Sequence, residues 1–201
     1  MRYDKAEFKA AYGTFGQLPE SDLPEIAFAG KSNVGKSSFI NMLSNNNKLA
    51  KVSATQGKTK LVNFFMMNNE FILVDLPGYG YAETSKVEQQ RWGKIIDSYL
   101  EGSSKLKAGV LLVDVRHAPT KQDIQMLDYL TFNNIPVTIV ATKYDKIKKS
   151  ERMSKLPDIA ATLKVGVENI SNVELISIIL KNGTKNKNVR DLAMEILNNY
   201  H

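Results

Sequence analysis

The chain has 201 residues, of which 43% are hydrophobic and 24% are charged. This size and composition fit one globular domain, or at most two small ones. The chain has no cysteine, which excludes disulfides, thiolate metal sites, cysteine nucleophiles and prenyl or palmitoyl anchors. The net charge of +6 excludes an acidic solvating tail and suggests an anionic partner.

The N-terminal residues carry charges of both signs and no apolar run, so no secretory signal is expected. The longest apolar runs have the length of strands, far short of the roughly 20 residues that a membrane span needs. We therefore expect a soluble cytoplasmic protein.

Short apolar runs alternate along the chain with longer stretches of helical period. The apolar runs predict strands at 25–30, 62–67, 71–76, 108–115, 137–142 and 173–177. The periodic stretches predict helices at 36–44, 86–100, 120–132, 150–163 and 187–200. This alternation predicts a three-layer α/β fold, with a six-stranded, mostly parallel sheet and helices on both faces. Only three residues separate 62–67 from 71–76, so these strands should form a hairpin that makes one edge strand antiparallel.

Local signals add detail to this prediction. Thr120, with Asp123 three residues later, predicts a capping box at one helix start. Ser150 is predicted to cap the next helix. The whole chain is read as one domain, with an N-terminal arm at 1–24 and a core at about 25–200.

A glycine-rich loop follows the first predicted strand and opens the first predicted helix. Its sequence GKSNVGKS fits the phosphate-binding pattern G-x-x-x-x-G-K-[ST]. Backbone N–H groups of such a loop converge on phosphate oxygens, the lysine adds a charge, and the final hydroxyl binds Mg²⁺. The predicted nucleotide contacts here are Gly30, Lys31, Ser32, Asn33, Val34, Gly35, Lys36, Ser37 and Ser38.

Two further segments are predicted to bind the metal and the γ-phosphate. The strand at 71–76 leads into DLPGYG, where Asp75 can hold Mg²⁺ and Gly78 can offer its N–H to the γ-phosphate. In the polar loop at 45–60, Gly57 and Thr59 are predicted contacts, and the Thr59 hydroxyl would close on Mg²⁺. Thr55 is the alternative to Thr59. Together with Ser37, Asp75 and Thr59 make up the predicted metal set.

The sequence TKYD after the fifth predicted strand indicates a guanine site. The Asp145 carboxylate can accept hydrogen bonds from N1–H and the exocyclic amine of guanine, which adenine cannot offer. The Lys143 stem can cover the ring, and Thr142 stands where guanine-binding proteins most often have Asn. Backbone N–H groups at Ser177 and Ile178 could meet the guanine O6, although a plain buried strand end explains these two residues almost as well.

The order of these motifs resembles that of GTPases of the translation-factor-related class. Several stretches resemble one family of that class, the EngB (YihA/YsxC) ribosome-biogenesis GTP-binding proteins. They are LPEIAFAGKSNVGKSSFIN, GKTKLVNFF, DLPGYGYA, DVRHAPTKQDIQML and TKYDK. The resemblance implies GTP and GDP binding with Mg²⁺, slow hydrolysis and a switch role in assembling the large ribosomal subunit, a role linked to cell division and septation.

Weak GTP hydrolysis is expected from the residue that follows Gly78. Many GTPases place a water-orienting Gln there, whereas this chain has Tyr79. The candidate catalytic set is Lys36, Thr59, Gly78 and Asn33. Asn33 stands where GTPases that use potassium carry an Asn, so K⁺ or the ribosomal particle is the expected activator; an ordinary loop role for Asn33 remains open.

Three Lys-rich stretches, at 45–60, 143–155 and 181–190, each carry a net charge of +4. They predict an RNA-binding surface, with solvated loops as the alternative. The resemblance implies that its partners are ribosomal RNA and proteins of the large-subunit precursor. We expect a monomer that binds neither DNA nor membranes. Two other functions remain open: a P-loop kinase or ATPase of a small metabolite, and a GTPase switch with protein-only effectors.

Overall fold

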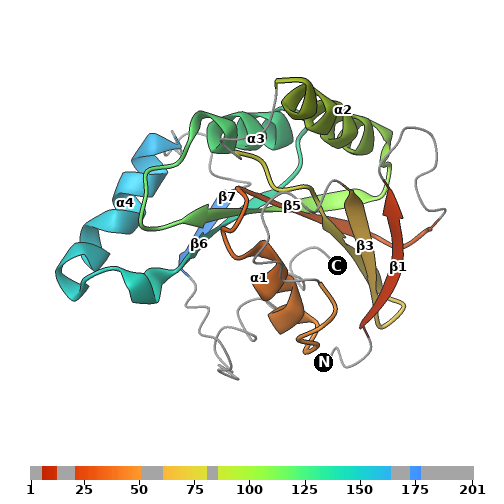
Figure 1. Cartoon of the computed structure of the whole chain (residues 1–201), viewed down its shortest axis with the longest axis horizontal. Helices are drawn as coiled ribbons and strands as arrows, with labels where there is room; N and C mark the ends of the chain where they lie inside the picture. The colour runs from red at the N-terminus through yellow and green to blue at the C-terminus, as the bar shows by residue number, and fades with distance from the viewer. Residues whose placement is uncertain (1–5, 13–20, 51–60, 81–85, 164–172, 178–201) are drawn as a thin grey trace.

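The computed structural model describes residues 6–12, 21–50, 61–80, 86–163 and 173–177, and a central sheet dominates it (Figure 1). The strands are β1 (Ala6–Tyr12), β2 (Glu25–Gly30), β3 (Val62–Met67), β4 (Phe71–Asp75), β5 (Leu106–Asp114), β6 (Val137–Thr142) and β7 (Val173–Ser177). The helices are α1 (Lys36–Leu43), α2 (Lys86–Gly102), α3 (Lys121–Phe132) and α4 (Arg152–Thr162), with short 3₁₀ turns η1 (Tyr144–Lys146) and η2 (Lys149–Glu151).

The strand order within the described residues is β1-β3-β4-β2-β5-β6-β7. Strands β4, β2, β5, β6 and β7 pair in parallel, and β3 runs antiparallel to both of its neighbours. The predicted three-layer α/β class is therefore confirmed. Because the parallel strands share one direction, the residues that follow them meet at one edge of the sheet.

The sheet has one strand more than the predicted six. Residues 6–12, predicted as part of an arm, form β1, which pairs antiparallel with β3 and becomes the edge strand. The ring of Phe8 lies 5.8 Å from that of Phe65 on β3, measured between centroids. The sequence of β1 shows no clear alternation of apolar and polar residues. This segment is a strand because it pairs with the open edge of β3.

The hairpin of β3 and β4 is confirmed. Its turn places Asn68 and Asn69 at φ angles of 50° and 60°, and the Glu70 N–H donates to the Met67 carbonyl at 2.8 Å. Positive φ at both central positions is typical of the type I′ turn, which asparagine tolerates well.

Two apolar clusters cover the two faces of the sheet. One packs residues of α2, α3 and α4 against one face, with Tyr99 and Leu130 almost fully buried. The other packs α1 against the opposite face through Phe39 and Ile40. In Figure 1, α2 and α3 accordingly lie on one side of the sheet and α1 on the other. None of the helices described is both long and apolar enough to cross a membrane.

The helix starts were predicted with mixed success. Thr120 accepts the Asp123 N–H and Asp123 accepts the Thr120 N–H, so the capping box of α3 is confirmed. The prediction for Ser150 is wrong, because α4 begins at Arg152 with Glu151 as its N-cap. The Glu151 side chain and N–H both bond to the backbone of Lys148, which places Ser150 inside the turn η2. The predicted helix at 187–200 lies outside the described residues.

Candidate nucleotide-binding site

The phosphate loop connects β2 to α1, as the sequence predicts. Gly30 ends β2 at a φ of 157°, where a Cβ would lie 2.8 Å from the Leu112 carbonyl oxygen and 2.9 Å from Val34 Cγ1. Any larger residue would push the loop away from β5. Helix α1 begins at Lys36, so its N-terminal N–H groups and the positive end of its dipole face the loop.

Lys36 is the charged centre of this end of the site. Its ammonium forms an ion pair with the Asp75 carboxylate at the end of β4, and the two residues are only 8% and 3% exposed. Each charge compensates the other in a buried setting. A bound nucleoside triphosphate with Mg²⁺ could replace this ion pair. Its phosphate oxygens would then contact the Lys36 ammonium, and the Mg²⁺ would contact the Asp75 carboxylate.

The oxygen donors at this point fit Mg²⁺. Ser37 follows Lys36 in the first turn of α1, and the Asp75 carboxylate lies against Lys36. Within the described residues no cluster of three acidic or histidine side chains could hold a metal alone. A hydroxyl and a carboxylate that share Mg²⁺ with nucleotide phosphates match that ion's preferences. Thr59, Gly57 and the alternative Thr55 lie outside the described residues.

The segment after β4 lies directly against the phosphate loop. The Ser32 hydroxyl donates to the Gly78 carbonyl at 3.2 Å, and the Ser32 N–H donates to the Tyr79 carbonyl at 2.9 Å. A Cβ on Gly78 would lie 3.0 Å from Ser32 Oγ and 3.1 Å from Ser32 Cα. The absence of a side chain at position 78 permits this approach.

The Tyr79 side chain is hydrogen-bonded to helix α3. Its hydroxyl donates to Asp123 Oδ1 at 2.7 Å, while Asp123 Oδ2 accepts from the N–H and hydroxyl of Thr120, both at 2.7 Å. Burial, and secondarily the Asp123 carboxylate, raise the pKa of Tyr79 well above its usual value. The phenol therefore stays protonated and serves as an anchor.

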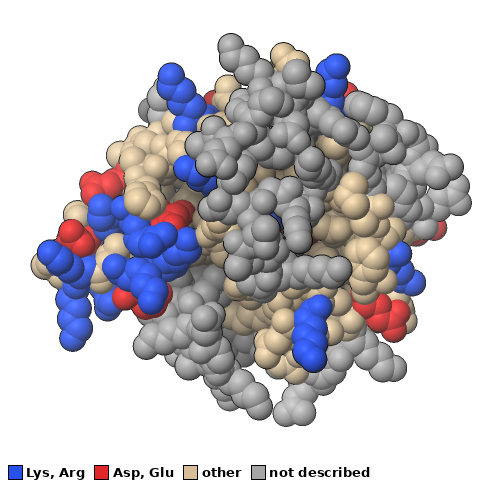
Figure 2. Space-filling view, in the orientation of Figure 1, with Lys and Arg blue, Asp and Glu red and all other residues tan. Residues whose placement is uncertain are grey.

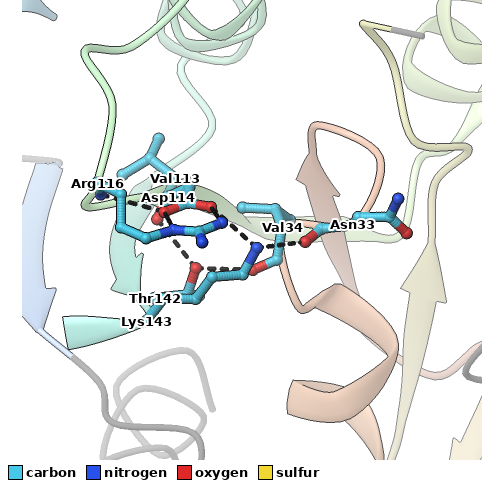
Figure 3. Close-up of polar contacts among 7 residues, drawn as sticks. All are labelled: Asn33, Val34, Val113, Asp114, Arg116, Thr142 and Lys143. Carbon is cyan, nitrogen blue, oxygen red and sulfur yellow. Dashed lines mark hydrogen bonds and ion pairs between the residues drawn. The ribbon is translucent and has the colours of Figure 1, made fainter. Parts of the chain in front are cut away.

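The TKYD segment is tied to the phosphate loop by two side chains. The Thr142 hydroxyl donates to the Val34 carbonyl at 2.7 Å, and the Lys143 ammonium donates to the Asn33 carbonyl at 2.7 Å (Figure 3). Thr142 thus links the two loops without the amide of the commoner Asn. The Asn33 side-chain amide points away from Lys143 in this view.

Asp145 lies in the turn η1, which begins directly after Lys143. Its side chain is 17% exposed, and its carboxylate lies 3.5 Å from the ammonium of the more exposed Lys146. No hydrogen bond to this carboxylate comes from the part of the chain that the structure describes, so its oxygens can accept from a ligand. β7 ends at Ser177, which is in register with Ala141 of β6. The Ser177 side chain and all of Ile178 lie outside what the structure describes.

Two residues of the site were not predicted. Asp114, at the carboxyl end of β5, accepts from the Lys143 ammonium at 2.9 Å and from the Arg116 guanidinium at 2.7 and 2.9 Å. Their signal was available, because Asp114 lies near the carboxyl end of the predicted strand at 108–115 and Arg116 follows that strand, at the edge that carries the other motifs. His117, beside them, is exposed, and its N–H donates to the Asp114 carbonyl.

The phosphate loop, the aspartate at the end of β4 and the TKxD turn together define a class of protein. The class is that of P-loop GTPases, in which these segments meet at the carboxyl ends of parallel strands.

Comparisons with known proteins identify the family within that class. The family model described as "50S ribosome-binding GTPase" matches residues 25–143. The "Probable GTP-binding protein EngB" of Clostridium kluyveri is 52% identical over 164 residues, which cover 82% of this chain and 83% of that protein. The chain belongs to the EngB family of GTP-binding proteins.

Solved structures agree with this assignment. The crystal structure of a probable GTP-binding protein EngB matches with a TM-score of 0.69 at 27% identity, over 87% of this chain and 97% of that one. Era in complex with MgGDPNP and nucleotides 1506–1542 of 16S ribosomal RNA matches with a TM-score of 0.65 at 26% identity, over 89% of this chain and 56% of Era.

The C-terminal part of the chain is similar to a different family. A second model, described as "UPF0758 N-terminal", matches residues 162–201. Ser177 and Ile178 lie within this segment, outside the residues that the GTPase model matches. Their role as donors to the guanine O6 stays a prediction.

Proposed function

We propose that this chain is a guanine-nucleotide switch that binds GTP and GDP with Mg²⁺, hydrolyses GTP slowly and acts in assembly of the large ribosomal subunit. The observation that carries the guanine site is the pair of contacts from Thr142 and Lys143 to the phosphate loop. These contacts tie the segment that carries Asp145 to the phosphate loop. One guanine nucleotide would then contact the loop with its phosphates and Asp145 with its base.

Slow hydrolysis is supported by the surroundings of Tyr79. Its hydroxyl proton is committed to Asp123 on α3, so the phenol does not donate it to a water molecule at the γ-phosphate. A monovalent cation near Asn33 would supply charge stabilisation in place of an arginine finger. We expect single-turnover hydrolysis to be faster in KCl than in NaCl of equal concentration, and equal rates would remove K⁺ from the proposal.

The ribosomal role is supported by the family description and by the surface. The matching family is described as ribosome-binding, and Era is seen with a ribosomal RNA fragment. Lys146 of η1, Lys149 of η2 and Lys148 between the two turns are exposed. Figure 2 shows basic side chains gathered on the side of the molecule that carries these turns and α4, with a few acidic ones among them. A cluster of this kind can bind phosphate backbones.

Nucleotide choice is the first test of the proposal. Fluorescent GDP and ADP analogues titrated against the purified chain should give tight binding of the guanine nucleotide alone, and Asp145→Asn should abolish the preference. Equal binding of both nucleotides would favour a kinase or ATPase of a small metabolite.

Sedimentation with ribosomal subunits is the second test. The chain should pellet with large-subunit particles when it is loaded with a non-hydrolysable GTP analogue, and less so with GDP. Raising the salt concentration should release it, because phosphate contacts exchange for counterions. Pelleting that depended on neither nucleotide nor salt would refute docking through the basic surface.

A further inference from the structure

We propose that Asp114 and Arg116 form a positioning pair that holds Lys143, and with it Asp145, in the geometry that reads the base. This inference rests on the proposed guanine-nucleotide site and assigns that site two further residues. Neither residue is placed against the nucleotide itself. Both act through Lys143.

The Asp114 carboxylate is committed to fixed donors (Figure 3). Oδ1 accepts from the Arg116 backbone N–H at 3.1 Å and from Arg116 Nε at 2.9 Å. Oδ2 accepts from Arg116 Nη2 at 2.7 Å and from Lys143 Nζ at 2.9 Å. The guanidinium grips both oxygens in the two-point geometry that Arg forms with carboxylates, which leaves one defined position for the lysine.

Lys143 is held between two acceptors from different parts of the chain. Its ammonium donates to the Asn33 carbonyl of the phosphate loop and to Asp114 at the end of β5. A flexible lysine side chain with one acceptor would sample many rotamers, whereas two acceptors on opposite sides fix its path. The lysine stem is thereby kept where it can cover a purine ring.

The backbone of Lys143 depends on the same contacts. Its φ angle is 61°, in the left-handed region that non-glycine residues seldom adopt. Such a conformation persists only where the surroundings determine it. Because Lys143 is the N-cap of η1, its backbone sets the direction in which Asp145 leaves β6. Weakening the Asp114 contact should therefore misplace the carboxylate that selects guanine.

The electrostatics agree with this geometry. Burial alone would raise the pKa of Asp114, but hydrogen bonds from Arg116 and Lys143 outweigh it and hold the pKa well below its usual range. Hydrogen bonding to Asp114, and more weakly the charge of Asp145, raise the pKa of Arg116. Arg116 thus lies within electrostatic reach of Asp145 as well. The shifted pKa values of Asp114 and Arg116 keep both groups charged at neutral pH.

The test compares GDP with IDP, which lacks the exocyclic amine of guanine. Wild type, Asp114→Asn and Arg116→Gln are titrated with fluorescent analogues of both nucleotides, and Arg116→Lys tests partial rescue. Asp128→Asn is the matched control, because Asp128 is exposed on α3 and lies apart from this cluster. Thermal unfolding of each variant reports on folding.

Asp114→Asn should weaken GDP binding about tenfold and IDP binding much less, so that the wild-type preference shrinks. Arg116→Gln should reduce the preference for GDP over IDP by about threefold. Arg116→Lys should give a preference between those of wild type and Arg116→Gln. If Asp114→Asn does not fold, Arg116→Gln on the more exposed side decides the question alone.

The opposite results separate two failures. Equal loss of GDP and IDP affinity, or an unchanged GDP preference in both variants, would overturn the positioning pair while the guanine site stands. Wild type that binds neither nucleotide, or both equally, would refute the proposed guanine site and this inference with it.

Discussion

The phosphate end and the base end of the site hold their charges in different ways. At the phosphate end, Lys36 and Asp75 are almost fully buried and pair with each other. At the base end, the side chains of Asp114, Lys143 and Arg116 are 16%, 26% and 41% exposed and form a network of shared hydrogen bonds.

This difference predicts different consequences of mutation. Breaking a buried ion pair leaves one charge without a partner or water, so the cost falls on folding as well as on binding. Half-exposed ion pairs contribute little to stability because water competes for them. Changes at the phosphate end should therefore affect folding and nucleotide binding together, and changes at the base end should mainly affect selectivity.

The largest effect is expected for Lys36→Met. It leaves the Asp75 carboxylate buried and unpaired, which should lower the free energy of unfolding by about 3 kcal/mol. GTP affinity should fall at least about a hundredfold with the loss of the phosphate contact. Urea denaturation and calorimetric titration measure the two, with the exposed Lys48→Met as the control. A variant as stable as wild type would contradict the buried pair.

Asp145→Asn tests the base end in the same manner. GDP affinity should fall about a hundredfold, because two hydrogen bonds to a charged acceptor are lost or reversed. The free energy of unfolding should change by less than about 1 kcal/mol, since the only described ion pair of Asp145 is with exposed Lys146. Strong destabilisation in urea would mean that the two ends do not differ as described.

Tyr79→Phe examines the segment that leads away from the phosphate end. The change removes the hydrogen bond to Asp123 and should cost about 1–2 kcal/mol of stability. The single-turnover rate of GTP hydrolysis should stay within about twofold, because the hydroxyl faces α3. Tyr129→Phe, a half-buried tyrosine of α3, serves as the control. A tenfold slower rate with an intact fold would make Tyr79 catalytic.

The smallest effect concerns pH and Asp114. Its pKa is lowered in the folded chain, so the carboxylate stabilises the fold above its ordinary pKa, and this contribution is lost as the pH falls. Wild type should lose stability below about pH 4 more steeply than Asp114→Asn, as measured by urea denaturation at several pH values. Parallel curves for the two chains would show that the pair does not stabilise the charged form.

The sequence predicted those parts of the fold and site that are encoded locally. The phosphate loop and the TKYD segment are contiguous, and the alternation of runs predicted six of the seven described strands. Edge strand β1 was missed because it forms by pairing with β3 and not by its own pattern. The start of α4 was misplaced because Glu151, not Ser150, bonds back to Lys148.

The C-terminal segment shows the limit of a motif prediction. The strand at 173–177 was predicted correctly and adds to β6 in parallel. Yet the residues from 162 onward match a family model other than that of the GTPase domain. A strand in the right place fixes the backbone direction, but the identity of a base contact depends on the loop that follows it.

The sequence by itself determined the class of fold and the position of the glycine-rich loop, and it predicted Asp145 as the guanine contact, because each depends on short-range spacing that one stretch of chain contains. Only the tertiary structure brought together Asn33, Asp114 and Lys143, with donor and acceptor 110 residues apart in one bond and 29 in another. It also gave the Tyr79 hydroxyl its partner 44 residues away. Such contacts follow from the order of strands in the sheet, which places the ends of β2, β5 and β6 side by side.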